Sequence, residues 1–281
     1  MMGITPRDVL GHQLEVPWPS LLQVEQDLLL CRAMAALFGD DFLRDQLAMR
    51  GGTLLHKVHL APASRYSEDI DLVVVGDRPE DHIRKGLRRV LLPVLGKPQH
   101  SVWESLRLAV RNAARPSRVL RMTYDVPSVV EPGKFLRIVV EANVTERTPH
   151  RSICELPFGF LFRKEQIETI VRGYEINEML GTKMRALFQR RRGRDLFDLH
   201  RAVMMKVSGL APGAVIESFC HYLEKEEVRA GRAEFTSLLE GHLADPGFCS
   251  DMNDLLKLGI DYDPHEAAQL VQRELIDLLP P

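Results

Sequence analysis

The chain has 281 residues, enough for one large domain or two modest ones, and its 45% apolar and 27% charged residues are ordinary for a globular protein. The formal net charge of −2 argues against a surface that is basic throughout, as a general nucleic-acid coat would need. No apolar run approaches the ~20 residues of a membrane span, and the N-terminus lacks a signal-peptide pattern. The scattered cysteines form no Cys-x-x-Cys pair, so we expect a reduced, cytoplasmic protein without membrane contact.

The first half of the chain predicts alternating helices and strands. Ser20 is suited to cap a helix that ends near Gly39, because its side chain can accept a free backbone N–H. Residues 102–111 fit a strand and a helix equally well, and periodicity leaves both open. The remaining predicted elements are strands at 46–49, 69–75, 119–126 and 135–144, and helices at 53–60 and 81–95.

The composition changes after Thr145, where a polar stretch with Pro149 predicts a boundary. We therefore divide the chain into an α/β domain at residues 1–148 and a helical domain at residues 149–281. The helices expected in the second domain lie at 165–172, 175–190, 194–206, 212–227, 232–242, 248–257 and 263–279.

The most informative motif joins a glycine turn to two nearby carboxylates. Gly51, Gly52 and Thr53 open a helix, where free N–H groups and the helix dipole favour a phosphate. Asp69 and Asp71 begin a strand, and residues i and i+2 of a strand point to the same side. Two such carboxylates favour Mg²⁺ shared with substrate phosphates. Either motif alone is more often a simple turn or an exposed strand end, but the pair in this order favours nucleotidyl transfer.

A third acid, Glu141, lies within the otherwise apolar strand predicted at 135–144. A buried carboxylate is costly unless a cation or donor compensates it, and two-metal phosphoryl transfer often uses a third acid. Glu141 is therefore our third candidate metal ligand. The alternative is that it occupies an exposed strand face.

A second group of charged residues lies in the predicted helical domain. Lys183 and Arg190 are seven residues apart and share one helix face, from which a lysine could reach a triphosphate. Asp195 begins the next predicted helix. For Asp198 we prefer a structural interpretation, such as a helix-dipole partner or an i,i+4 ion pair with Arg194.

Several blocks of the chain together resemble one known family. The blocks are GGTLLHKV, RYSEDIDLVVV, FLRIVVEANV and EMLGTKMRALFQRRRGRDLFDLHRA. They resemble the nucleotidyltransferase AbiEii/AbiGii toxins, which include the MenT toxins and belong to the DNA polymerase β-like superfamily. The blocks span about residues 46–206, and the helical block is the more discriminating part. The resemblance implies a nucleotidyltransferase fold with a mixed sheet, followed by an all-helical domain.

The resemblance also assigns roles in the first domain. The family's phosphate-binding turn falls on Gly52 and Thr53, with threonine where many members have serine. Its metal-binding pair falls on Asp69 and Asp71, which would hold two Mg²⁺ ions. Glu141 would complete the second metal site, although the acid on this strand is less regular in the family.

In the helical domain, the family's Lys-x-x-Ala-Leu block falls on Lys183 in the form KMRAL, and its arginine–aspartate pair falls on Arg194 and Asp195. The resemblance implies that Lys183 binds the β- and γ-phosphates of the NTP. Arg194 or Asp195 would align the nucleotide or the acceptor, so that Lys183 and Asp195 are counted with the catalytic residues.

The implied activity is transfer of a nucleoside monophosphate from an NTP to RNA at the 3′ end of tRNA. The protein would be the toxin of a type IV toxin–antitoxin or abortive-infection system and have a cognate antitoxin. Further support for an RNA acceptor comes only from basic residues, namely the arginine-rich helix and Arg107, Arg111, Arg115, Arg118 and Arg121. The alternatives are a small-molecule or protein acceptor, and a non-catalytic nucleotide-binding module.

Overall fold

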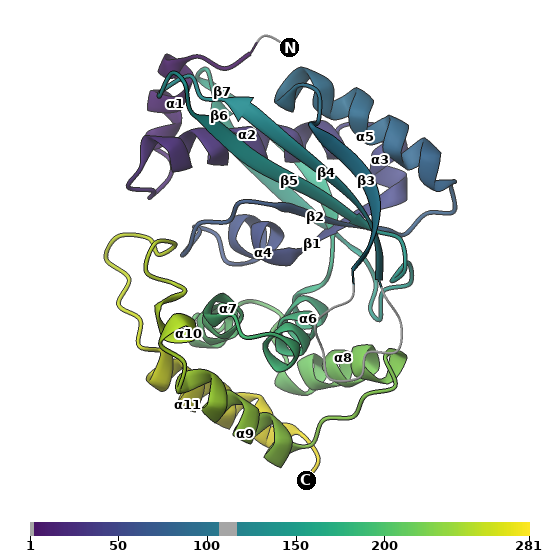
Figure 1. The fold of residues 1–281 in the computed structure, drawn as a ribbon, viewed down its shortest axis with the longest axis vertical. Helices are drawn as coiled ribbons and strands as arrows, with labels where there is room; N and C mark the ends of the chain where they lie inside the picture. Colours follow the sequence, from purple (N-terminus) through teal and green to yellow (C-terminus); the bar gives the residue numbers. More distant parts are fainter. Residues whose placement is uncertain (1–2, 107–116) are drawn as a thin grey trace. The chain divides into compact units, whose positions relative to one another are not determined.

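The computed structural model describes residues 3–106 and 117–281 (Figure 1). The chain divides into two compact units. The first holds residues 3–105, 117–149 and 153–174, and the second holds residues 106, 150–152 and 175–281. The first unit is built on a mixed sheet and the second is helical, so the predicted fold class is confirmed. Within the described ranges, no helix combines the length and apolarity needed to cross a membrane.

The sheet of the first unit has seven strands among the described residues, in the order β3-β4-β5-β2-β1-β7-β6. Strand β2 lies at its centre, antiparallel to β1 and parallel to β5, while β4 pairs with β5 in antiparallel fashion. The strands predicted near 46–49, 69–75, 119–126 and 135–144 are confirmed. The bounds are β1 (Leu47–Arg50), β2 (Ile70–Val74), β3 (His100–Leu106), β4 (Ser117–Pro127), β5 (Phe135–Asn143), β6 (Cys154–Phe162) and β7 (Glu165–Gly173).

Two long helices pack on the sheet. Ser20 caps α2, accepting the N–H of Leu22, which confirms the predicted helix start. Helix α2 packs against α5, β5 and β7, and is buried along most of its length (Figure 1). The helical segments of this unit are α1 (Pro6–Gln13), α2 (Leu21–Phe38), α3 (Asp41–Gln46), α4 (Gly51–Leu54), the π-helical turn η1 (Leu55–His59) and α5 (Glu80–Leu95).

Strand β7 occupies the residues for which we predicted a helix at 165–172, and that prediction was wrong. Strands β6 and β7 form an antiparallel hairpin in which Phe162 pairs with Glu165. Arg163 and Lys164 make the turn with φ values of 53° and 67°, and two-residue hairpin turns require such left-handed conformations. Neither is Gly, Asn or Asp, so the sequence lacks the usual signal of this turn.

Residues 102–106 lie in strand β3, which settles that part of the ambiguous segment, while residues 107–111 lie outside the described residues. In the second unit, α6 packs against α7, α8 and α9, and α7 packs against α11. The helix expected at 248–257 is shorter and begins earlier, at Pro246. The bounds are α6 (Ile176–Gln189), α7 (Gly193–Met204), α8 (Pro212–Lys225), α9 (Arg232–Leu243), α10 (Pro246–Ser250), α11 (Pro264–Glu274) and the 3₁₀ turn η2 (Ile276–Leu278).

Candidate active site

The glycine turn lies directly against one of the predicted metal ligands. Arg50 ends β1, and Gly51 begins α4 with φ of +79°. Arg50 pairs in register with Asp71 on the antiparallel neighbour β2. A Cβ atom added at Gly51 would overlap Asp71 Oδ2, so only glycine permits this approach. The turn and the carboxylate thus meet because β1 and β2 are neighbours.

A row of charged side chains crosses the sheet at this level. Asp71 on β2 pairs in register with Glu141 on β5, and Glu141 pairs with Arg121 on β4. With Arg50 on β1, the row places two carboxylates side by side between two guanidinium groups. Directly opposed like charges destabilise a sheet, which marks the two acids as a candidate cation site.

The charges in the row shift the ionisation of their neighbours. Partial burial of Glu141 and the adjacent Asp71 charge raise its pKa, while Arg121 acts against that shift. Burial opposes the charge of Arg50, but Glu146 and, more weakly, Asp71 hold the pKa of Arg50 above its usual value. Glu146 is also the ion-pair partner of Arg50. The acidic centre is therefore flanked by cations that remain charged at neutral pH.

Asp69 lies one position before β2, and its side chain is exposed. Burial opposes the charge of Arg121, but Glu141, Glu104 and Asp69 raise its pKa, so the charge of Asp69 acts at the same guanidinium as that of Glu141. The Asp69 carbonyl oxygen accepts a hydrogen bond from Thr53 Oγ1. The structure therefore pairs Asp71 with Glu141 across neighbouring strands, while the predicted metal-binding role of Asp69 beside them stays a prediction.

Thr53 is buried, and its hydroxyl braces the turn against the start of β2. It lies 2.9 Å from Ser67 Oγ and bonds to the Asp69 carbonyl. Arg65 approaches the same turn, because a Cβ at Gly52 would lie 2.6 Å from Arg65 Nη2. The predicted phosphate-binding role of Thr53 stays a prediction, and its observed hydrogen bonds give it a structural one.

Lys183 lies on α6 of the second unit, where it belongs to a buried ionic cluster. Its Nζ is 2.7 Å from Asp198 Oδ2 and 3.3 Å from Asp195 Oδ1. Arg190 holds Asp195 through bonds of 2.8 and 3.0 Å. Burial would raise the pKa of Asp195, but Lys183 and Arg190 hold it below its usual value. The backbone N–H of Arg194 donates to Asp251. The predicted catalytic roles of Lys183, Arg194 and Asp195 stay predictions.

A second group of potential metal ligands lies in the first unit. His12, Asp27 and Cys31 are buried, and their ligand atoms lie within 4.8 Å of one another, a spacing that Asp69, Asp71 and Glu141 do not reach in the described structure. Lys57 on η1 places its Nζ 2.6 Å from Asp27 Oδ1 and 3.4 Å from Cys31 Sγ, so an ammonium already compensates this carboxylate. Mg²⁺ prefers oxygen ligands, which the acids near β2 supply better.

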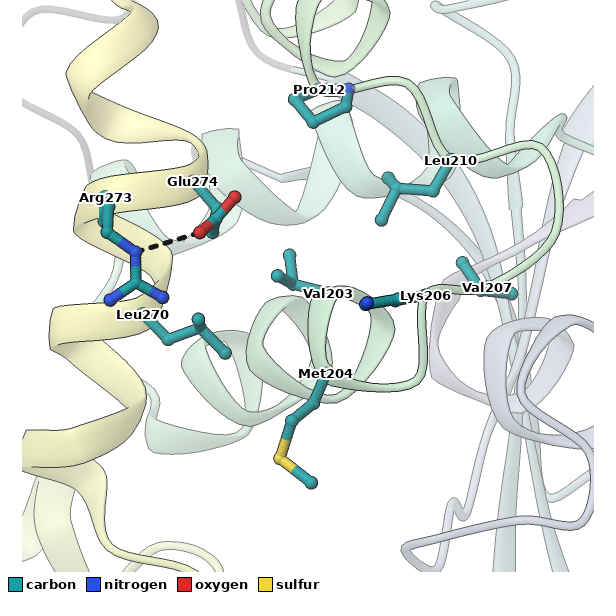
Figure 2. A pocket seen from close by; sticks show the side chains of 9 residues that line it. All are labelled: Val203, Met204, Lys206, Val207, Leu210, Pro212, Leu270, Arg273 and Glu274. Carbon is teal, nitrogen blue, oxygen red and sulfur yellow. Dashed lines mark hydrogen bonds and ion pairs between the residues drawn. The ribbon is translucent and has the colours of Figure 1, made fainter.

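The pocket in Figure 2 lies wholly within the second unit and contains none of the predicted site residues. It has a volume of about 440 Å³. Val203, Val207, Leu210 and Leu270 form much of its lining, with the Arg273–Glu274 ion pair at one side.

Sequence reasoning did not place three arginines near Asp71 and Glu141. Arg50 and Arg65 were not considered, and Arg121 was not recognised as the partner of Glu141. A signal for Arg65 existed, because it shares odd numbering with Asp69 and Asp71 and so belongs to the same side of an extended chain. Arg121 had no comparable signal, because its pairing with Glu141 depends on the register of β4 and β5.

A glycine turn set against carboxylates on neighbouring strands of a mixed sheet suits an enzyme that binds a metal–phosphate complex. Residues 32–271 match the family described as nucleotidyl transferase AbiEii toxin of type IV toxin–antitoxin systems, and the chain belongs to this family. It is therefore a nucleotidyltransferase toxin that uses an NTP, and the family implies a cognate antitoxin.

A solved structure supports the fold. The chain is similar to MenT4, a nucleotidyltransferase toxin from Mycobacterium tuberculosis H37Rv, with 17% identity and a TM-score of 0.55. The similarity covers 99% of this chain and all of the MenT4 chain. No curated protein sequence matches.

Proposed function

We propose that this toxin transfers a nucleoside monophosphate from an NTP to RNA, with the 3′ end of tRNA as the acceptor and Mg²⁺ as the required cation. The observation that supports it best is the register pairing of Asp71 with Glu141, directly beside the turn at Gly51. A metal–triphosphate complex requires ligands for the cation and donors for the phosphates. The two adjacent carboxylates can bind the cation, and the start of α4, which has no side-chain cap, has backbone N–H groups that can bind phosphate.

The residues present fit a divalent cation. Asp69, Asp71 and Glu141 supply oxygen ligands only, and the pKa of Glu141 is raised by its burial and by the negative charge of Asp71, both of which a bound cation would offset. Mg²⁺ bound there would neutralise charge on the phosphates and lower the pKa of the attacking hydroxyl.

The chain's own groups would position the nucleotide. The backbone N–H of Gly52 would bind the phosphates, as the family resemblance implies, and Arg65 adds positive charge against the same turn. Thr53 holds the turn in place through Asp69. Lys183, Arg194 and Asp195 keep the roles that the family resemblance assigns to them, with Lys183 on the phosphates.

We place the protein in the cytoplasm, where its tRNA acceptor would be found. An RNA acceptor also requires basic side chains on the protein surface. Of the arginines named for this purpose, Arg118 and Arg121 lie on β4 with partly exposed side chains. Arg107, Arg111 and Arg115 lie outside the described residues. Phosphate contacts by arginines predict RNA binding that weakens as salt rises.

The test is labelling of total tRNA by purified protein with Mg²⁺ and labelled NTPs. Asp71→Asn and Glu141→Gln should each reduce labelling by about a hundredfold or more. Asp125→Asn is the matched control, because this acid also lies on the sheet but pairs with Arg137 away from the row. Undiminished labelling by the double variant Asp69→Ala plus Asp71→Ala would contradict the proposed chemistry. Labelling of a small molecule or protein without tRNA labelling would contradict the proposed acceptor.

A further inference from the structure

Arg121 lies between two carboxylates from the strands on either side of it. Its Nε and Nη2 are 2.8 and 2.6 Å from Glu141 Oε1, and its Nη1 is 3.3 Å from Glu104 Oε2 on β3. The three side chains are 36%, 23% and 35% exposed in the order Arg121, Glu141, Glu104, so water reaches this arrangement. The guanidinium is thus already paired with a second carboxylate.

Glu141 cannot serve Arg121 and a divalent cation equally well. Two N–H groups of Arg121 converge on one oxygen of Glu141, and a cation beside that carboxylate would repel the guanidinium. Glu104 offers Arg121 an alternative partner that requires only a side-chain shift, because one contact to it exists already.

We propose that Arg121 competes with the divalent cation for Glu141 and transfers to Glu104 when the cation binds. Arg121 is then a positioning residue that sets the cation concentration that the enzyme requires. This inference rests on the proposed metal-binding role of Asp69, Asp71 and Glu141.

The experiment measures binding of Mn²⁺ alone to the full chain, by the electron paramagnetic resonance signal of free Mn²⁺, without nucleotide. Arg121→Gln should lower the Kd by about threefold to tenfold, the range for loss of a partly exposed ion pair. Glu104→Gln should raise the Kd, because Arg121 then has no second acceptor. Arg118→Gln is the matched control on the same strand, since Arg118 pairs with Glu80 and stacks over Trp103.

A double variant separates competition from a general effect of charge. If Glu104 acts only by receiving Arg121, adding Glu104→Gln to Arg121→Gln changes nothing further. Additive effects, or an unchanged Kd in Arg121→Gln with a normal melting temperature, would overturn the inference. Wild-type protein that shows no Mn²⁺ binding sensitive to Asp71→Asn would overturn the proposed metal site as well, so the two failures are distinguishable.

Discussion

Asp71 on β2 lies directly opposite Glu141 on β5, so two carboxylates face each other across a parallel strand pair at the centre of the sheet. Within the described part of the chain, no side chain or backbone N–H donates a hydrogen bond to the Asp71 carboxylate. Like charges in this position lower stability, and proteins retain such an arrangement where function requires it.

Asp71→Asn should therefore separate stability from activity. Removing one of two facing charges should change the free energy of unfolding by no more than about 0.5 kcal/mol, while activity falls by at least about a hundredfold. Urea unfolding and tRNA labelling measure the two effects. A loss of several kcal/mol would instead identify Asp71 as a structural residue.

Mg²⁺ should stabilise the wild-type protein but not Asp71→Asn. At ten times its Kd, a ligand that binds only the folded state adds about 1.4 kcal/mol, which raises the melting temperature by about 2–4 °C in a chain of this size. Thermal melts with Mg²⁺ and with a chelator give the comparison. Equal shifts in both proteins would place the cation elsewhere.

Gly51→Ala should abolish activity without removing any reactive group. The added methyl would overlap Asp71 and also occupy a left-handed backbone conformation, and a displacement of about 1 Å can cost a hundredfold in rate. Gly96→Ala is the matched control, because Gly96 has φ of +81° but open space around its Cβ position. It should lose about 1 kcal/mol of stability and keep its activity. Equal activity losses in both variants would contradict this account.

Asp27→Asn should destabilise the first unit by about 3–5 kcal/mol, because it leaves the buried Lys57 ammonium without its carboxylate. Lys57→Met in the same chain should restore part of that loss. Lys57 and His12 hold the pKa of Asp27 below its usual value despite burial. The ionised Asp27 carboxylate therefore contributes its full stabilisation above pH 3.8 and loses it as the pH falls further. The difference in unfolding free energy between the wild type and Asp27→Asn should narrow in that acidic range. Unfolding at several pH values checks this; a constant difference would contradict it.

Lys183→Met should also unfold the protein more easily, by about 3 kcal/mol or more, because Asp195 and Asp198 are fully buried beside it. Loss of activity in this variant alone therefore says little about catalysis. Adding Asp198→Asn removes one of the two buried carboxylates that Lys183 compensates, while Arg190 still pairs with Asp195, and should recover part of the stability. If the double variant folds and regains full activity, the predicted phosphate-binding role of Lys183 is wrong.

The sequence predicted the elements that have strong local signals. Ser20 starts its helix as expected, and the strands that carry Asp71 and Glu141 follow from their apolar runs. The hairpin turn at Arg163 and Lys164 was missed because the left-handed conformations of these residues are imposed by pairing of β6 with β7. Local propensity is a weak guide where tertiary pairing decides the conformation.

The candidate site was predictable in its acids but not in its bases. Asp69 and Asp71 are two residues apart in sequence, so a strand alone brings them together. Arg50 and Arg121 join them only through strand order and register, which depend on contacts across the whole sheet. The positions of these two arginines beside the acids can consequently be known only from the folded sheet.

The hydrogen bond from Thr53 to the Asp69 carbonyl joins two points of the chain that sixteen residues separate. This hydrogen bond, rather than the intervening loop, thus fixes the distance between the start of α4 and the acids at β2. Ala61 and Pro62 in that loop are exposed. An insertion between Ala61 and Pro62, such as a tag or reporter, should accordingly preserve the spacing of the reactive groups, whereas Ser64, Arg65 and Tyr66 of the same segment are buried.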